Sequence, residues 1–135
     1  MNLIIDQGNS VCKWAFFENA PGAKTDYTRL DALEPVAIFY TQHPEEMLSG
    51  EIFKQFKPRA AIYSSVLNRT DDVKYEAIKQ NINLCFRFDS TTPIPVKNNY
   101  SQPQSLGADR LAAAVGAWTL APGKPSLIVD LGTAI

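Results

Sequence analysis

The sequence has few of the residues that build metal clusters or disulfide frameworks. Its 135 residues include two cysteines, Cys12 and Cys85, and one histidine, His43, and these three are far apart along the chain. Such spacing argues against a zinc cluster and against a disulfide scaffold, and it is typical of a protein in a reducing cytoplasm.

Long apolar runs and an excess of positive charge are also lacking. No run approaches the ~20 apolar residues of a membrane-spanning helix, and the first apolar segment begins without a preceding signal peptide. Thirteen basic and fourteen acidic residues give a net charge of −1, with no arginine-rich segment or basic stripe. We therefore expect neither a membrane nor a nucleic acid as partner.

The chain is organised around residues 3–17, LIIDQGNSVCKWAFF, in which two apolar runs flank a polar turn. This pattern predicts two antiparallel strands joined by a hairpin. Gly8 would let the backbone approach a ligand closely, Asp6 suits a hydrated cation, and Lys13 suits a phosphate. The alternative is an ordinary hairpin whose polar side chains satisfy only their own backbone.

A similar pattern closes the sequence. Residues 126–134, SLIVDLGTA, again run from a predicted apolar strand into an Asp-x-Gly-hydroxyl turn, here Asp130 to Thr133. Two such turns suggest two related halves that face one phosphate-bearing ligand. At 45% apolar residues the chain can bury one good core but not two full domains. We expect residues 1–120 to form a first domain and 121–135 to begin a second, the remainder of which is absent.

Predicted strands and helices alternate along the chain. Strands are predicted at residues 2–6, 12–18, 25–30, 60–66 and 84–88, helices over 43–57, 70–80 and 106–118, and residues 36–40 suit either element. The side chains expected on the buried helix faces are Met47, Ile52, Phe53 and Phe56, then Val73, Ala77 and Ile78, then Leu106, Leu111, Ala114, Val115 and Trp118. The order predicts an α/β fold whose mixed sheet opens with an antiparallel meander and continues with parallel β-α-β units.

Two segments place polar groups where open sheets bind ligands. Residues 64–65, a pair of serines, end a predicted parallel strand, where they either contact substrate or permit close packing. The loop 89–105 is rich in Pro, Ser, Thr and Asn and carries Tyr100. A long polar loop of this kind is usually functional or disordered, and the alternative is a surface connector with Tyr100 packed against the core.

The Ala-rich helix begins with an adjacent acid and base, Asp109 and Arg110. Gly107 and Ala108 before them leave the first backbone N–H groups open to an anion. One interpretation is that the two charges only suit the helix end and the solvent. The other is that Asp109 acts as a general base for a hydroxyl while Arg110 holds an anionic group of the same substrate.

Four motifs, taken in order, resemble those of the type III pantothenate kinases. They are Asp6-Gln7-Gly8-Asn9-Ser10-x-x-Lys13, Asn99-Tyr100, Leu106-Gly107-Ala108-Asp109-Arg110 and Asp130-Leu131-Gly132-Thr133-Ala134. These bacterial CoaX-type enzymes open coenzyme A synthesis, and some relatives are named as transcriptional accessory factors of the Bvg type. The resemblance implies the N-terminal part of such a protein, with a ribonuclease H-like domain of the actin/hexokinase/sugar-kinase ATPase superfamily.

The resemblance also implies roles by position. The residues implied in ATP binding are Asp6, Gln7, Gly8, Asn9, Ser10, Val11, Cys12, Lys13 and Thr133. The residues implied in pantothenate binding are Tyr100, Gly107, Ala108, Asp109 and Arg110, with Asp109 as the catalytic proton acceptor. Asp130 would help to hold a monovalent cation, K⁺ or NH₄⁺, and Mg²⁺ with the nucleotide is a further candidate. Family members commonly carry Thr where Ser10 stands, so a hydroxyl is kept.

The implied function is ATP-dependent phosphorylation of pantothenate to 4'-phosphopantothenate by a cytoplasmic homodimer. Two alternatives stay open at this point. One is another kinase or phosphatase of the same superfamily, since a fold alone does not fix the substrate. The other is a non-catalytic regulatory protein on the same fold, which DNA binding by the purified protein would favour.

Overall fold

The computed structural model describes residues 1–18, 34–66 and 73–129. Its centre is a mixed sheet with the strand order β3-β2-β1-β4-β5. The strands are β1 (Asn2–Gln7), β2 (Cys12–Phe17), β3 (Ala37–Thr41), β4 (Ala60–Ser65) and β5 (Leu84–Phe88). β1, β2 and β3 are paired antiparallel, whereas β4 runs parallel to both β1 and β5. The predicted fold class, an antiparallel meander followed by parallel β-α-β units, is confirmed.

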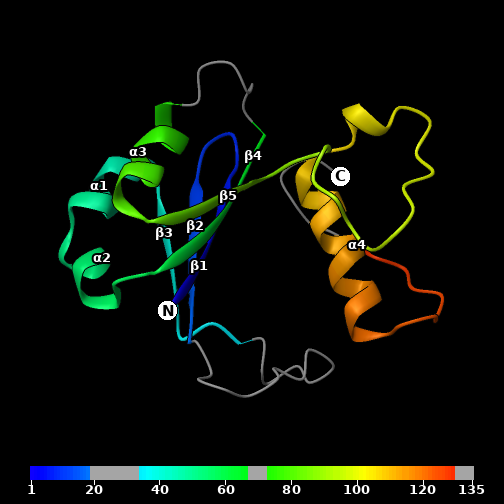
Figure 1. The fold of residues 1–135 in the computed structure, drawn as a ribbon, viewed down its shortest axis with the longest axis horizontal. Helices are drawn as coiled ribbons and strands as arrows, with labels where there is room; N and C mark the ends of the chain where they lie inside the picture. Colours follow the sequence, from blue (N-terminus) through cyan, green and yellow to red (C-terminus); the bar gives the residue numbers. More distant parts are fainter. Residues whose placement is uncertain (19–33, 67–72, 130–135) are drawn as a thin grey trace.

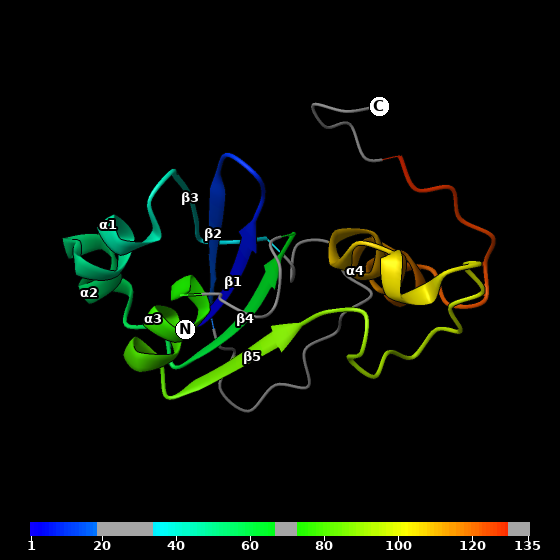
Figure 2. The ribbon, with the colours of Figure 1, turned by 90° about the horizontal axis from the view of Figure 1, so that it is seen from above.

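Helices cover the two faces of the sheet unequally. They are α1 (Pro44–Ser49), α2 (Glu51–Phe56), α3 (Val73–Asn81) and α4 (Ala108–Leu120), with a short 3-10 turn at Pro103–Ser105. Figures 1 and 2 show α1, α2 and α3 on one side of the sheet and α4 on the other. No helix among the described residues is long and apolar enough to cross a membrane.

The hydrophobic core lies between the sheet and the first three helices. Successive residues of a strand point to opposite faces, and those on this face are the buried ones. The hydrophobic strand residues that are at most 2% exposed here are Leu3, Ile5, Cys12, Trp14, Phe16, Ala61 and Tyr63. Phe16 stacks on Phe56 of α2 with ring centroids 4.6 Å apart, and Phe39 of β3 meets both rings edge-on. These aromatic contacts attach α2 to the meander.

Most predicted strands are confirmed, and one open assignment is settled. The strands predicted at 2–6, 12–18, 60–66 and 84–88 match β1, β2, β4 and β5 to within one residue at each end. Residues 36–40, which suited either element, contain most of β3, which is the third strand of the meander. The third strand predicted at 25–30 lies outside the described residues.

The prediction of one helix over 43–57 is wrong, because the helix is interrupted at Gly50. Gly50 has an extended backbone, with φ −78° and ψ 164°, and so separates α1 from α2. The buried face was predicted well, since Met47 and Phe53 are buried and Ile52 and Phe56 pack against the core. α2 ends before Pro58 as expected, at a left-handed Lys57.

Two predicted faces also need correction. Val73 was expected to point inward but is 77% exposed, because α3 turns Tyr75 and Ile78 toward the sheet instead. In α4, Leu111 is buried as predicted, whereas Trp118 is 45% exposed.

The apolar segment at 126–129, predicted to be a strand, has no regular secondary structure. Leu127 is 91% exposed, and the segment pairs with none of the described strands. The prediction of a second strand ending in Asp130 is therefore wrong for the described part of the segment, 126–129.

Candidate functional site

The turn between β1 and β2 is tight and well defined. The Gly8 N–H donates to the Val11 carbonyl at 3.0 Å, which closes the hairpin directly after the Gln7–Cys12 pair. A Cβ atom at Gly8 would lie 3.2 Å from the Val11 oxygen, so a larger residue would strain the turn. Asn9 and Ser10 are exposed at its tip. The predicted phosphate-binding turn thus forms as a compact hairpin with its small polar residues outward.

A row of polar side chains crosses the sheet next to this turn. Asp6 pairs with Lys13 on β2 and with Ser64 on β4, so the three side chains share one face of the sheet. Tyr40 on β3 extends the row, and the centroid of the Tyr40 ring lies 6.0 Å from the Nζ atom of Lys13. The face that carries this row is the one opposite α1, α2 and α3. A carboxylate therefore lies between a lysine and a serine at the carboxyl edge of the parallel strands.

The end of β4 lies beside the turn that begins at Gly8. The Val66 N–H donates to the Gln7 carbonyl at 3.1 Å, which extends the pairing of β1 and β4 by one residue. Ser64 points to the face of Asp6, and Ser65 points to the face of Gln7. The sequence reasoning left a contact of these serines with substrate as one of two options, and their position at the turn is compatible with it.

The start of α4 lies on the same face as Asp6. Ala108 and Leu111 are buried, and the helix contacts β4. In Figure 1 the helix begins at the end of the molecule where β1 and β4 finish. Asp109 and Arg110 are both exposed there. The helix that carries the predicted base is therefore placed next to the strand that pairs with Asp6.

Gly107 makes room for the Asp109 carboxylate. A Cβ atom at Gly107 would collide with Oδ1 of Asp109 and would lie 3.4 Å from its Cγ. The carboxylate is thus folded back over the residue that precedes the helix, at the end where backbone N–H groups point outward. This position is suited to accepting a proton from a group that approaches the helix end.

The loop 89–105 runs on the side of the molecule that carries α4 (Figures 1 and 2). Asp89 begins it by accepting hydrogen bonds from the Thr91 N–H and hydroxyl at 2.8 and 2.6 Å. Tyr100 is 48% exposed, and its N–H donates to Asn98 Oδ1 at 3.0 Å. The alternative in which Tyr100 packs against the core is therefore wrong, and its ring is open to solvent.

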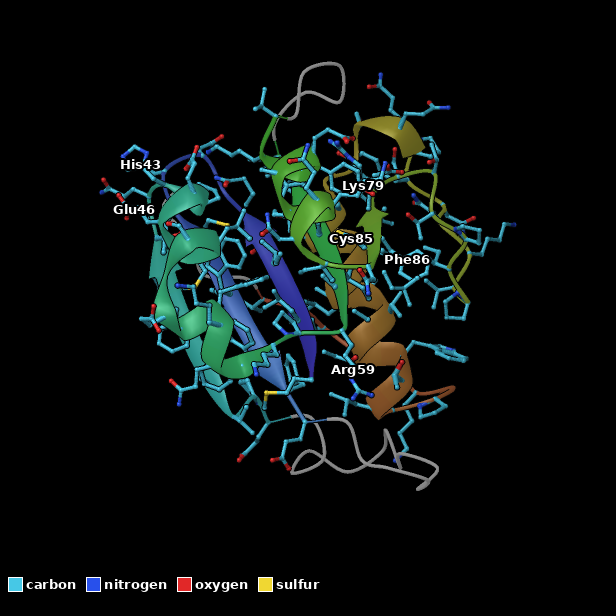
Figure 3. The ribbon with its side chains drawn as sticks, turned by 60° about the vertical axis from the view of Figure 1, so that its left-hand side comes forward. His43, Glu46, Arg59, Lys79, Cys85 and Phe86 are labelled. Atoms are coloured by element: carbon cyan, nitrogen blue, oxygen red, sulfur yellow. The ribbon has the colours of Figure 1, made fainter. Side chains whose placement is uncertain are left out.

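His43 lies at the start of α1, and two predicted site residues are not described by the structure. Asp130 and Thr133 fall outside the described residues. In Figure 3, His43 and Glu46 lie at the start of α1, far from Cys85 under α3. Within residues 1–18, 34–66 and 73–129, no group of three His, Cys, Asp or Glu side chains could hold a metal ion. A hollow of about 350 Å³ lies near α1 and α2 and is lined by Thr41, Glu46, Met47, Gly50, Glu51 and Ile52, none of which is a predicted site residue.

Sequence reasoning missed one cation at this edge. Lys74, in the first turn of α3, places its Nζ atom 3.4 Å from Oε1 of Gln7. A right-handed crossover brings the start of its helix to the carboxyl edge of the sheet, so a basic residue near the start of the helix predicted over 70–80 was the available signal.

The residues at this edge fit a nucleotide phosphate. The turn at Gly8 is tight enough that a Cβ atom there would crowd the Val11 carbonyl, and it leaves backbone N–H groups available to an anion. Lys13 supplies a positive charge beside it. Asp6 supplies a carboxylate of the kind that binds hydrated cations. A mixed sheet with this strand order, with polar groups at the carboxyl ends of its parallel strands, is that of a ribonuclease H-like domain of the actin/hexokinase/sugar-kinase ATPase superfamily.

Comparison with known proteins identifies the family. Residues 2–135 match the sequence profile of type III pantothenate kinase, and the chain belongs to this family. It is similar to proteins named type III pantothenate kinase from Azobacteroides pseudotrichonymphae, Bacteroides fragilis and Porphyromonas gingivalis. The identities are 32% over 135 residues, 36% over 138 and 38% over 135, respectively. These alignments cover 99–100% of this chain but 49–50% of each relative, so the chain spans about half the length of the curated relatives it matches.

Proposed function

We propose that the protein phosphorylates pantothenate with ATP, giving 4'-phosphopantothenate in the first step of coenzyme A synthesis. The supporting observation is the convergence of two segments at one edge of the sheet. These are the Gly8 turn, flanked by Asp6 and Lys13, and the start of α4 with Asp109. Membership of the family over residues 2–135 supports pantothenate as the substrate.

In this proposal the turn binds the nucleotide and the helix end binds the acceptor. The backbone of residues 8–11 and Lys13 hold the phosphates of ATP, and Tyr100 and Arg110 hold pantothenate. The primary hydroxyl oxygen attacks the γ-phosphorus, the bond from phosphorus to the ADP oxygen breaks, and the hydroxyl proton passes to Asp109. Phosphoryl transfer depends mainly on positioning and charge neutralisation, and a rigid turn and a helix end provide both.

The proposal includes the domain division, the cation site and the oligomer. We assign residues 1–120 to the first ribonuclease H-like domain and residues 121–135 to the beginning of the second. Asp130 would hold K⁺ or NH₄⁺, which would neutralise phosphate charge when bound, and Thr133 would contact ATP. We further propose a homodimer that works in the cytoplasm, where Cys12 and Cys85 would stay reduced.

The first test is the Asp109→Asn variant of the full-length protein, assayed for ADP release with pantothenate and ATP, with and without K⁺. We expect turnover to fall by about 10²–10⁴-fold, since general-base catalysis contributes that much. The melting temperature should stay within the error of the wild type, because Asp109 is exposed.

The matched control is Glu45→Gln, an exposed acid in the first turn of α1 on the other side of the sheet. It should keep wild-type turnover. Wild-type rates in Asp109→Asn would exclude Asp109 as the base. A wild-type protein that hydrolyses polyphosphate or phosphorylates a sugar, and leaves pantothenate unchanged, would exclude the proposed substrate.

A further inference from the structure

Gln7 is a fully buried polar side chain next to the phosphate turn. It is 1% exposed and points to the sheet face that α1, α2 and α3 cover. Its side chain therefore lies on the face opposite Asp6 and Lys13. A buried amide is tolerated only when its donors and acceptors are paired, so the contacts of Gln7 indicate what it does.

The two ends of the Gln7 amide contact two different elements. Nε2 donates to the Gly8 carbonyl at 2.6 Å, and Oε1 accepts from Nζ of Lys74 at 3.4 Å. The opposite orientation of the amide would place its NH₂ group against an ammonium and its oxygen against a carbonyl. Both contacts would be repulsive, so the charge of Lys74 fixes the amide orientation and thereby the donor to Gly8.

Holding the Gly8 carbonyl also orients the next N–H group of the turn. A trans peptide is planar, and its C=O and N–H bonds point in opposite directions. Because the Gly8 carbonyl turns toward the Gln7 amide on the buried face, the Asn9 N–H of the same peptide points away from that face. In the proposed function, that is the direction in which the turn meets phosphate.

We propose that Gln7 is a positioning residue that aims the Asn9 N–H at the nucleotide, and that Lys74 of α3 locks its amide. This inference rests on the proposed binding of ATP by the turn. Lys74 lies in the first turn of α3, where the helix dipole disfavours a positive charge. The hydrogen bond from Lys74 to Oε1 of Gln7 offsets this unfavourable interaction. Through Gln7, the start of α3 is thus connected to the turn that begins at Gly8.

Variants of the full-length protein separate the donor from the acceptor of the amide. Gln7→Met removes both contacts and keeps an unbranched side chain of similar length. Gln7→Glu keeps an acceptor for Lys74 but loses the donor to Gly8. We expect both to raise the KM for ATP by about three- to tenfold, as expected for one lost hydrogen bond, and to leave the KM for pantothenate unchanged. Lys74→Met should raise the KM for ATP less, and Lys74→Arg should restore it.

The matched controls are Gln80→Met and Lys79→Met, exposed residues near the far end of α3. They should leave both KM values unchanged. A purely structural role predicts a lower melting temperature in Gln7→Met and Gln7→Glu with a wild-type KM for ATP, and that result would overturn the proposal.

A second readout does not need turnover. In ¹⁵N-labelled protein, ATP alone should shift the Asn9 amide resonance of the wild type. In Gln7→Met that shift should require several-fold more ATP, and the Gly8 N–H should exchange faster. If pantothenate is not phosphorylated but these shifts occur as described, the proposed function fails and the role of Gln7 stands. If ATP shifts Asn9 equally in wild type and Gln7→Met, the role of Gln7 is wrong.

Discussion

At the scale of single residues, the indole of Trp14 depends on one hydrogen bond. The ring is fully buried, and its Nε1 atom donates to Oγ1 of Thr41 on β3 at 2.9 Å. We expect Thr41→Val to lower the free energy of unfolding by about 1–3 kcal/mol, because it leaves a buried donor without an acceptor. Urea unfolding followed by Trp fluorescence measures the change. Thr41→Ser keeps the hydroxyl and should recover most of the loss, and equal losses in both variants would contradict this role.

The two thiols should differ in reactivity. Burial raises the pKa of the Cys85 thiol, Lys79 opposes this rise, and Glu76 adds to it. Figure 3 shows Cys85 beneath α3, whereas Phe86 points to the other side of β5. At each pH the folded protein therefore holds less Cys85 thiolate than the unfolded chain does, and only the thiolate reacts with iodoacetamide.

Labelling of Cys85 should thus be slower in the native protein than in urea, and the difference should narrow only as the pH rises through the alkaline range. The same raised pKa makes the stability depend on pH. The neutral Cys85 thiol contributes stability below the ordinary thiol pKa, and this contribution is lost as the pH rises through the raised pKa of the folded protein. In Cys85→Ser, the buried Cys12 should react only on unfolding. Equal native rates for the two cysteines would contradict this assignment.

At the scale of elements, two glycines should respond oppositely to alanine. A Cβ atom at Gly50 would lie 2.9 Å from the Glu46 carbonyl, whereas one at Gly116 in α4 would meet nothing within 4 Å. We expect Gly50→Ala to destabilise by about 1–3 kcal/mol through this overlap. Gly116→Ala should stabilise by about 0.5–1 kcal/mol, as alanine does in a helix interior. Urea midpoints of the two variants measure both signs, and stabilisation by Gly50→Ala would show that α1 and α2 can merge.

The same elements show what a sequence pattern can and cannot specify. The strands were predictable because alternation and turn residues are local signals. The break at Gly50 was not, since residues 44–56 have a continuous helical pattern of apolar residues and a single glycine is tolerated in helices. Val73 was placed wrongly because α3 has a weakly amphipathic sequence, so tertiary contacts of Tyr75 and Ile78 decide its orientation.

At the scale of the whole molecule, the candidate site could be predicted only in part. The turn after β1 and the charged start of α4 stand out in the sequence, and in the fold both lie at the end of the molecule where β1 and β4 finish. The contact of Gln7 with Lys74 joins residues 67 positions apart, and it exists only because the crossover returns α3 to that edge. No local pattern encodes such a contact.

The face that carries the site is covered incompletely. Below the polar row, a second row crosses the sheet in register, and it consists of Ile38, Ala15, Ile4, Ile62 and Phe86. Ile4 and Ile62 are 44% and 45% exposed, although α4 lies on this side. On the opposite face, the corresponding residues Ile5 and Tyr63 are fully buried. Stability therefore arises mainly between the sheet and the first three helices, and α4 is attached to this body through a smaller contact.

This difference predicts a gradient of amide hydrogen exchange. β1, β2 and β4 have neighbours on both sides, whereas β3 and β5 each have one neighbour in the described sheet, and residues 126–129 are exposed. We expect exchange to be slowest in β1, β2 and β4, faster in β3, β5 and α4, and fastest in 126–129, because local opening costs least where few contacts are lost. Mass spectrometry of peptides from the folded protein measures this order. Protection of α4 equal to that of β1 would mean that the helix is held as rigidly as the central strand. In the proposed function, Asp109 would then be in place before the substrate binds. Faster exchange in α4 would mean that the start of the helix becomes ordered only when the substrate binds.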